Sequence, residues 1–162
     1  MPDPASLEVL IKRLQHLEDE RAILRTLYRY GHAIDYGEEA RWADCFTEDG
    51  VFDIRSLAAD GSVAEAIQIS GRAALLDFVR QHPRAPDTLH KHLVVEPIID
   101  IRGEEAQVAS YFEMLLARGG RREIFTFGRY LDRLSRCDDG GWRFRERIAE
   151  IQTSGEDFPR RS

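Results

Sequence analysis

The stretch HKHLVVEPIIDIRGEEAQVASYFEMLLARGGRREIFTFGRYLDRLSR, residues 90–136, decides the fold of this chain. Three long runs within it, bounded by turn residues, predict strands at 90–101, 106–118 and 123–136. The two turns between these runs are short and contain glycine, and such turns join antiparallel neighbours. The stretch therefore predicts an antiparallel meander at the centre of the domain.

Further elements extend the meander on both sides. A fourth long strand, 142–151, follows a glycine-rich turn. Upstream, the pattern predicts two strands, 51–55 and 64–70, joined by a hairpin turn at 59–62. A short helix at 71–81 follows them. Residues of both parities are apolar in the long strands. We therefore expect both sheet faces to be covered, one by helices and the other by a second subunit of a homodimer.

The chain before the sheet has helical periodicity. Apolar residues recur at helical spacing in two series: Leu7, Leu10, Ile11, Leu14 and Leu17, then Ile23, Leu24, Leu27, Tyr28, Gly31 and Ile34. The polar run 18–21 between the series predicts a break between two helices. A short third helix, about 38–46, places Trp42 and Phe46 on one side, and the turn residues 47–50 end it. Helices followed by a meander predict an α+β fold with N-terminal helices packed on the sheet.

Length, charge and composition limit the classes of function. The 162 residues fit a single domain, which we place at 1–155, followed by a C-terminal tail at 156–162. A net charge of −6 argues against nucleic-acid binding. No apolar run reaches the roughly 20 residues needed to cross a membrane, and charges occupy the N-terminus where a signal peptide is apolar. We therefore expect a cytoplasmic protein without a membrane contact.

Two groups of residues receive a purely structural interpretation. Cys45 and Cys137 lie far apart and form no CxxC motif, so we interpret them as reduced thiols. Three arginines of the last strand share one parity, while apolar neighbours take the other; the residues are Arg143, Arg145 and Arg147 against Trp142, Phe144 and Ile148. This pattern predicts a solvated arginine face or a subunit contact rather than a nucleic-acid site.

The histidines of the first long strand are the most distinctive local feature. His90 and His92 alternate along the strand, so they project to the same face. With Glu96 and Gly103 they form the pattern HxHxxxExxxxxxG, which resembles half of the cupin metal-binding motif, and these ligands suit iron or manganese. That motif also needs a glycine where this chain has Arg84, and a histidine on a later strand, but none follows His92. We therefore expect no metal site.

Asp35 is the second candidate for chemistry. It follows Leu24, Leu27 and Gly31 at steps of three or four, which places it on the apolar face of its helix. Burial and the negative end of the helix dipole both act against an ionised carboxylate there, unless a cation or donor is close. Such an environment suits a general base or a partner for histidine, and it equally fits an aspartate that begins the turn to the next helix.

Several weak motifs occur in a fairly specific order. They are LRTLYRYGHAID, FTEDGVFD, a glycine-led helix, TLHKHLVVEPIIDI, GRYLDRL and GGWRFRER. Over roughly residues 18–150 they resemble the SnoaL-like proteins of the nuclear-transport-factor (cystatin-like) fold, a group with polyketide cyclases, ketosteroid isomerase, scytalone dehydratase and bile-acid dehydratase. The resemblance implies a strongly curved antiparallel sheet that forms a cone with an internal pocket. It does not specify one reaction, because this fold hosts many.

The resemblance also implies roles for single residues. In the dehydratases, an aspartate at the helix end and a histidine on the first long strand form the acid–base pair, and these positions correspond to Asp35 and His92. A tyrosine five residues before the aspartate corresponds to Tyr30. The pocket tyrosine of the first strand is replaced here by Ile54, and the later acidic residue or histidine by Leu115 or Arg118. We expect a pocket for a small hydrophobic ligand, lined by Trp42, Phe52, Ile54 and Phe112.

These residues predict proton transfer without a cofactor. His92 shares a strand face with Val94 and Ile98, and helices covering that face would bring it to Asp35. A histidine–carboxylate pair can move one proton from carbon to a leaving oxygen. Tyr30 fits either a donor to a developing oxyanion or ordinary core packing. The remaining histidines are expected at the surface, with no role: His16, His32 and His82.

The predicted activity is that of a lyase or isomerase, with dehydratase-type chemistry on a small cyclic or aromatic hydrophobic substrate. Two alternatives from another class remain open. One is a ligand-binding domain that performs no chemistry, and the other is the non-catalytic small subunit of a ring-hydroxylating dioxygenase, which shares this fold.

Overall fold

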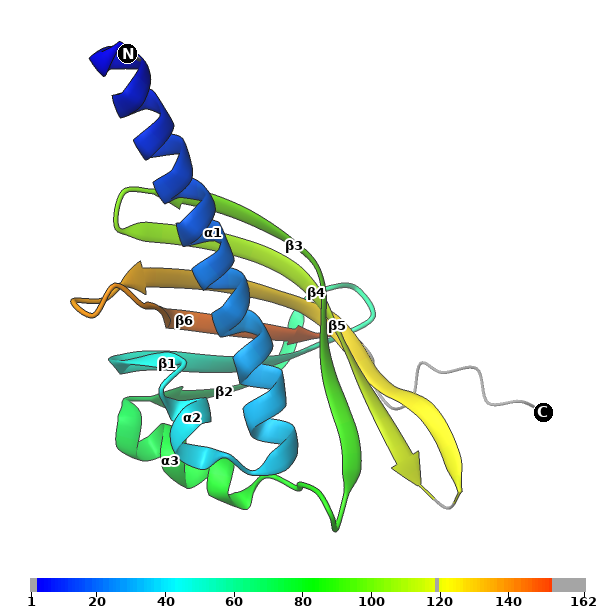
Figure 1. Ribbon diagram of the computed structural model, residues 1–162. Helices are drawn as coiled ribbons and strands as arrows, with labels where there is room; N and C mark the ends of the chain where they lie inside the picture. Colours follow the sequence, from blue (N-terminus) through cyan, green and yellow to red (C-terminus); the bar gives the residue numbers. More distant parts are fainter. Residues whose placement is uncertain (1–2, 119, 153–162) are drawn as a thin grey trace.

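The structure is a computed structural model that describes residues 3–118 and 120–152, so the predicted tail at 156–162 lies outside the described residues. Six strands form one sheet in the order β2-β1-β6-β5-β4-β3, and the helix α1 (Pro4–Tyr36) crosses one face of it (Figure 1). The sheet curves around α1 without closing on itself. The α+β prediction is confirmed. The N-terminal part of the chain forms one continuous helix, α1, where two helices were expected.

The meander has the predicted order and direction. Its strands are β3 (Leu89–Arg102), β4 (Glu105–Arg118), β5 (Arg121–Arg136) and β6 (Trp142–Ile151), and each pairs antiparallel with the next. β6 then pairs in parallel with β1 (Phe46–Leu57), which pairs antiparallel with β2 (Val63–Ser70). The predicted hairpin turn therefore joins β1 to β2, and β1 starts earlier than expected.

The residues Thr47–Gly50 were predicted to be a turn, but they lie within β1. Between the partners Phe46↔Phe144 and Val51↔Glu146, four residues of β1 face a single residue of β6, so the turn chemistry makes a bulge instead. The Thr47 hydroxyl donates to Asp49 at 2.9 Å inside this bulge. A bulge bends a strand, and this one lies at the start of β1, shortly after the end of α2 (Glu39–Ala43).

The predicted break in the first helix is wrong, because α1 is continuous from Pro4 to Tyr36. The polar run contains Asp19, which is buried and accepts a hydrogen bond from the Trp142 indole at 3.2 Å. Asp19 also forms an ion pair with Arg136. The run is therefore an anchor to the sheet. α1 ends at Gly37, whose φ of 70° suits a left-handed cap and whose N–H donates to the Ala33 carbonyl.

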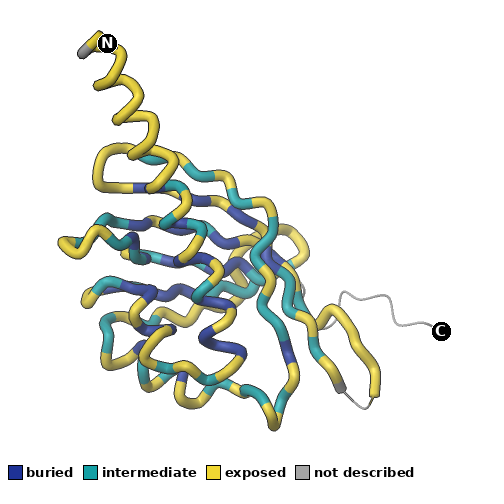
Figure 2. The backbone as a smooth tube through the Cα atoms, in the orientation of Figure 1, coloured by how far each residue is buried: buried dark blue, intermediate teal, exposed yellow. Residues whose placement is uncertain are grey.

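The N-terminal turns of α1 project beyond the sheet and are exposed along their length (Figure 2). Their apolar residues are each about half exposed: Leu7, Leu10, Ile11, Leu14 and Leu17. Tyr28, expected on the inward face, is also half exposed, and Tyr30 is buried in its place. Among the described residues no helix is apolar and long enough to span a membrane.

Two short helices cover the β1–β2 side of the sheet. α2 (Glu39–Ala43) buries Trp42, and α3 (Arg72–Gln81) buries Leu75 and Val79 against the same layer. The predicted third helix is thus shorter than expected at its C-terminus. Cys45 follows it as a buried free thiol, and burial raises its pKa to about 12, which agrees with an unreactive structural cysteine.

Arg147 is the largest departure from the predicted strand faces. It is fully buried, and its guanidinium donates two hydrogen bonds of 2.9 Å to the buried Asp132. The expectation of a solvated arginine face fails because the partners Arg133↔Glu146 and Leu134↔Phe144 leave Arg145 as an extra residue. That bulge changes the parity of β6, so Arg143 and Arg145 keep to the outside while Arg147 turns inward.

Aromatic rings enclose the buried cation. The Arg147 guanidinium lies 4.2 Å from the Tyr30 ring centre and 3.8 Å from that of Tyr130, and Phe144 completes the enclosure at 4.2 Å. Burial acts to lower the pKa of Arg147, but the Asp132 carboxylate raises it above its ordinary value, so the guanidinium remains charged. The interior of the curved sheet is therefore filled around this ion pair.

A second bulge changes the parity of β3. The pairing of β3 with β4 shifts between Val95 and Ile98, and Glu96 has a φ of 51° there. Ile98 was expected on the face of His92, but it is 75% exposed on the outer face, while Ile99 takes the inner side. The outer face of the meander carries exposed apolar side chains: Leu93, Ile98, Tyr111, Leu115, Ile124 and Phe127.

The Arg147–Asp132 pair predicts a large and non-additive effect on stability. Replacing Asp132 by Leu, or Arg147 by Met, leaves the other member of the pair as an uncompensated buried charge and should lower the free energy of unfolding by about 3–5 kcal/mol. The double variant Arg147→Met/Asp132→Leu should lose much less than the sum of the two single changes. Urea unfolding measures all three, and Arg145→Met, which removes an exposed cation, should change the free energy by no more than about 0.5 kcal/mol.

Candidate functional site

Asp35 and His92 are in direct contact. Asp35 lies in the last turn of α1 with a side chain 3% exposed, and its Oδ1 is 2.7 Å from Nδ1 of His92 on β3. The backbone N–H of His92 also donates to the carboxylate, at 3.2 and 3.3 Å. Because a carboxylate only accepts, the contact assigns the proton to Nδ1 and leaves the Nε2 lone pair of His92 available.

A glycine permits this contact. Gly31 lies one turn before Asp35, and a Cβ built on it would be 2.8 Å from the backbone carbonyl oxygen of His92. A side chain at this position would therefore separate α1 from β3. The Asp35 carbonyl also accepts from the N–H of Ala85 at 3.2 Å, which ties the end of α1 to the segment between α3 and β3.

Three histidines converge beside Asp35. The rings of His82, His90 and His92 lie 5.2–5.5 Å apart between centroids, and one ring nitrogen of each lies within 4.8 Å of the others. His90 Nε2 is 3.4 Å from Asp35 Oδ1, and its side chain is 3% exposed. We refer to His82, His90 and His92 as the histidine cluster.

His82 was expected at the surface without a role, and this expectation is wrong. It caps the C-terminus of α3, partly buried against the other two rings. A signal was present in the sequence, because His82 follows the inward residues Leu75 and Val79 at helical spacing. The cupin motif places its further histidine after His92, whereas the third histidine of this cluster comes earlier in the chain.

The surroundings keep two of these histidines neutral. Burial, together with charge on His92 and His90, lowers the pKa of His82 to about 4. Burial also lowers the pKa of His90, with the same contribution from His92, while Asp35 acts in the opposite direction. At neutral pH both rings therefore keep a nitrogen lone pair available for hydrogen bonding or coordination.

The histidine cluster borders a groove of about 450 Å³. His82 and His90 line it, together with apolar side chains of β4 and β5 that include Met114, Leu116 and Phe125. Two polar residues, Asp87 and Thr88, line it from the segment between α3 and β3. An apolar groove with a few convergent polar groups is the usual form of a small-molecule site.

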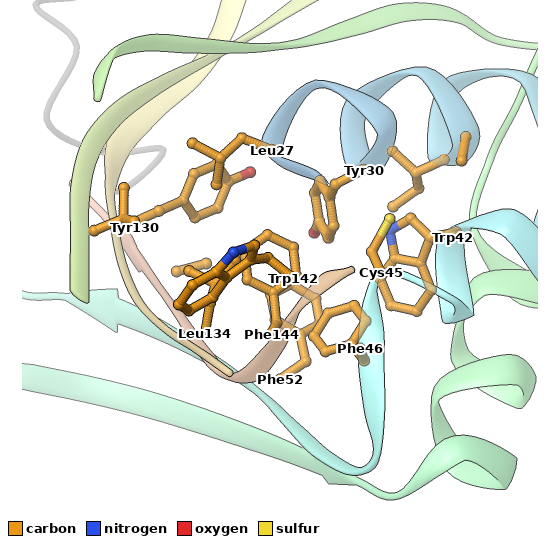
Figure 3. Packing of buried hydrophobic residues seen from close by; sticks show 14 of the residues in the cluster. Leu27, Tyr30, Trp42, Cys45, Phe46, Phe52, Tyr130, Leu134, Trp142 and Phe144 are labelled. Atoms are coloured by element: carbon orange, nitrogen blue, oxygen red, sulfur yellow. The ribbon is translucent and has the colours of Figure 1, made fainter. Parts of the chain in front are cut away.

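The predicted ligand-contacting residues lie elsewhere. Trp42, Phe52 and Phe112 are buried in the core cluster, and Ile54 packs against it, so none of the four lines this groove. Figure 3 shows Tyr30 among the same rings, in contact with Trp42 at 5.5 Å and with Tyr130 at 6.0 Å between centroids. The roles predicted for these residues stay predictions, and the packing favours a structural role.

The cupin-like set of ligands is not assembled. Glu96 lies at the β3 bulge and is exposed, and it is not in the group of His90 and His92. Positive φ at Glu96 and the shifted pairing separate it from the two histidines that precede it. Among the described residues, the histidine cluster is the one group of three or more potential metal ligands, and Asp35 contacts two of its members.

Comparison with known proteins places this geometry in a family. The sequence model of the SnoaL-like domain matches residues 15–148. Among solved structures, a single-residue variant of Rv3472, a protein of unknown function from Mycobacterium tuberculosis, has a TM-score of 0.70 and 29% identity, over 90% of this chain and 83% of that chain. No curated protein matches this sequence.

Two further structures, both from Novosphingobium aromaticivorans, are similar in fold. An NTF2-like protein with a cystatin-like fold has a TM-score of 0.75 and 18% identity, over 96% of this chain and 94% of that one. A chain named as the beta subunit of an aromatic-ring-hydroxylating dioxygenase has a TM-score of 0.71 and 20% identity, over 87% and 93%. The predicted nuclear-transport-factor fold is confirmed.

The close approach at Gly31 predicts that Gly31→Ala disturbs the site. Alanine should gain about 1 kcal/mol of helix propensity over glycine. The overlap of its Cβ with the His92 carbonyl should outweigh this gain and give a net destabilisation of about 1–3 kcal/mol. Urea unfolding measures the loss, and the His92 ring resonances should shift in the same variant. His32→Ala, at the exposed neighbouring position, should leave both unchanged; equal behaviour of the two variants would contradict the steric argument.

Proposed function

This chain belongs to the SnoaL-like domain family, and we propose that it is a lyase or isomerase whose proton carrier is His92, held by Asp35. The observation that carries the proposal is the 2.7 Å contact between a buried carboxylate and His92 Nδ1, next to an apolar groove. The proposed reaction is of the dehydratase type and needs no cofactor, because the pair itself accepts and returns the proton.

The pair would act as one unit. With Nδ1–H directed to Asp35, the Nε2 lone pair of His92 takes a proton from the carbon next to a substrate carbonyl, and the electron pair moves into an enolate. Asp35 stabilises the imidazolium that forms. The imidazolium then returns the proton to the oxygen on the β-carbon, the C–O bond breaks, water leaves and a C=C bond forms. Return of the proton to a different carbon would give an isomerase instead.

The groove supports a substrate class. Its walls of Met114, Leu116 and Phe125 favour a flat hydrophobic molecule, and its open side fits a small cyclic or aromatic compound. His82 and His90 line the groove, and the His92 ring lies 5.2–5.5 Å from both of theirs between centroids, so a carbonyl compound in the groove would reach His92 past these two rings. A low-dielectric wall strengthens the charge interactions that stabilise an enolate.

The pair predicts a characteristic loss of activity. His92→Gln and Asp35→Asn should each slow turnover by about 10²–10⁴, the range for a general acid–base group. The double variant should lose far less than the product of the two losses, because the residues act together. The assay follows loss of water from a panel of cyclic β-hydroxyketones, and exchange of the α-hydrogen in deuterated water by NMR.

The matched control is His32→Gln, which changes an exposed histidine on α1 and should leave turnover unchanged. Variants with native circular dichroism but unaltered exchange rates would contradict the assignment of His92 and Asp35. Multiplicative losses in the double variant would show that the two residues act separately.

The fold also supports a second candidate function. The likeness to a dioxygenase beta subunit favours a non-catalytic subunit or ligand-binding domain. The two functions differ in what the protein carries with it. A subunit of that kind should co-purify from its own cells with a larger iron-containing partner, and it should catalyse neither water loss nor exchange by itself.

The exposed outer face of the meander supports a homodimer. We propose that Leu93, Ile98, Tyr111, Leu115, Ile124 and Phe127 meet the same residues of a second copy, because contiguous exposed apolar patches mark interaction sites. Light scattering at micromolar concentration should give twice the chain mass of 18.6 kDa.

A lysine on this face should oppose association, so Ile98→Lys should give a monomer. Asp138→Lys adds a lysine in the exposed β5–β6 turn and should leave the dimer intact. A monomeric wild-type protein would refute the proposed interface.

A further inference from the structure

The histidine cluster has the composition of a transition-metal site. It brings together three imidazoles from two elements, His82 from the end of α3 and His90 and His92 from β3, with one nitrogen of each within 4.8 Å of the others. Imidazole is a preferred ligand of zinc, copper, iron and nickel. We infer that His82, His90 and His92 bind a divalent transition-metal ion, with zinc as the reference ion.

One buried nitrogen of the cluster makes no hydrogen bond. It is Nε2 of His90, which lies 3.4 Å from Asp35 Oδ1 and has no hydrogen-bond partner among the described residues. A buried polar atom without a partner is unfavourable, and native structures rarely retain one without a reason. A metal ion in the cluster would give this nitrogen a partner.

A histidine binds a metal through a neutral nitrogen, so protons compete with the ion and zinc binding should strengthen as pH rises. Asp35 is an acidic group in contact with the cluster, through His90 and His92.

Asp35 supplies the outer contact that metal-binding histidines usually have. Its Oδ1 lies 2.7 Å from Nδ1 of His92, which fixes the ring and directs the other nitrogen away from the carboxylate. A carboxylate in this position makes the imidazole a stronger ligand and adds a negative charge near the ion. The contact that would orient His92 for proton transfer therefore also fits it for coordination.

The cluster leaves room for a further ligand. His82 and His90 both border the groove of about 450 Å³, so an ion between the three rings would be reached from it. Three protein ligands and one open position are the pattern of zinc sites that bind water or a small molecule. The ligand class that fits is a small hydrophobic molecule with one oxygen donor, because the rest of the groove wall is largely apolar.

Coordination and proton transfer need the same lone pair. An ion held by His92 Nε2 would prevent that nitrogen from taking a proton from carbon, so the metal-bound form would be inactive in the reaction proposed above. The inference concerns equilibrium binding without substrate, so its failure leaves the proposed reaction unaffected. Equally, an inactive protein that binds zinc through the cluster would leave the inference in place.

The experiment is a metal titration of the full chain without an affinity tag, after treatment with chelator and dialysis. Calorimetry with Zn²⁺ should give one ion per chain. His82→Gln should weaken binding by more than about 100-fold, since loss of a ligand exceeds the effect of an outer partner. Asp35→Asn should weaken it by about 10–100-fold. The matched control, His32→Gln, removes an exposed histidine and should bind as the wild type does.

A second measurement avoids variants that fail to fold. In the wild-type protein, Zn²⁺ should shift the imidazole resonances of His82, His90 and His92 and leave those of the exposed His16 and His32 in place. Absence of saturable zinc binding in the wild type would overturn the inference. Equal affinities of His82→Gln and His32→Gln, or shifts confined to His16 and His32, would do the same.

Discussion

The position of the candidate site depends on one buried carboxylate. The Asp35 carboxylate accepts hydrogen bonds from the ring Nδ1–H and the backbone N–H of His92, so it joins the C-terminal end of α1 to β3. Leaving this carboxylate without a donor in the interior would be unfavourable, and the sheet supplies the donors through His92, the proposed proton carrier. Gly31 makes the helix approach close enough for this, and the Ala85 contact draws in the connection from α3. His82 then reaches the same place.

The order and direction of the elements could be predicted because they follow from local signals. Long β-rich runs separated by glycine turns predict the meander, and the helical face of Leu27, Gly31 and Asp35 predicts burial of the aspartate next to the sheet. Ile98 and Arg147 were placed on the wrong faces for one shared reason. Each follows a bulge, and a single inserted residue reverses every later side chain of a strand. Bulges have no sequence signature as clear as a turn, so parity could not be carried across them.

The contents of the interior could not be predicted from the family resemblance. A cone-shaped sheet suggests an internal pocket, but here Tyr30, Tyr130 and Phe144 close around the Arg147–Asp132 pair. An arginine enclosed by rings and held by two hydrogen bonds occupies part of the interior of the curved sheet. The accessible polar groups are therefore displaced to the groove between the end of α3 and strands β3–β5. Nothing local in the sequence distinguishes a filled interior from an open one, because aromatic residues line both.

The histidine cluster shows why a predicted contact can be found while its surroundings are missed. The contact of Asp35 with His92 was expected from the helix and strand faces and from the family resemblance. His82 belongs to a third element, and only the packing of α3 against β3 brings its ring within 5.5 Å of the other two. Once the three rings meet, burial keeps His82 and His90 neutral, so their ring nitrogens can serve the proposed proton transfer or the proposed ion. Which of these uses prevails is then decided by competition between a proton and a metal for one nitrogen of His92, and that competition shifts toward the metal as pH rises and as free metal increases.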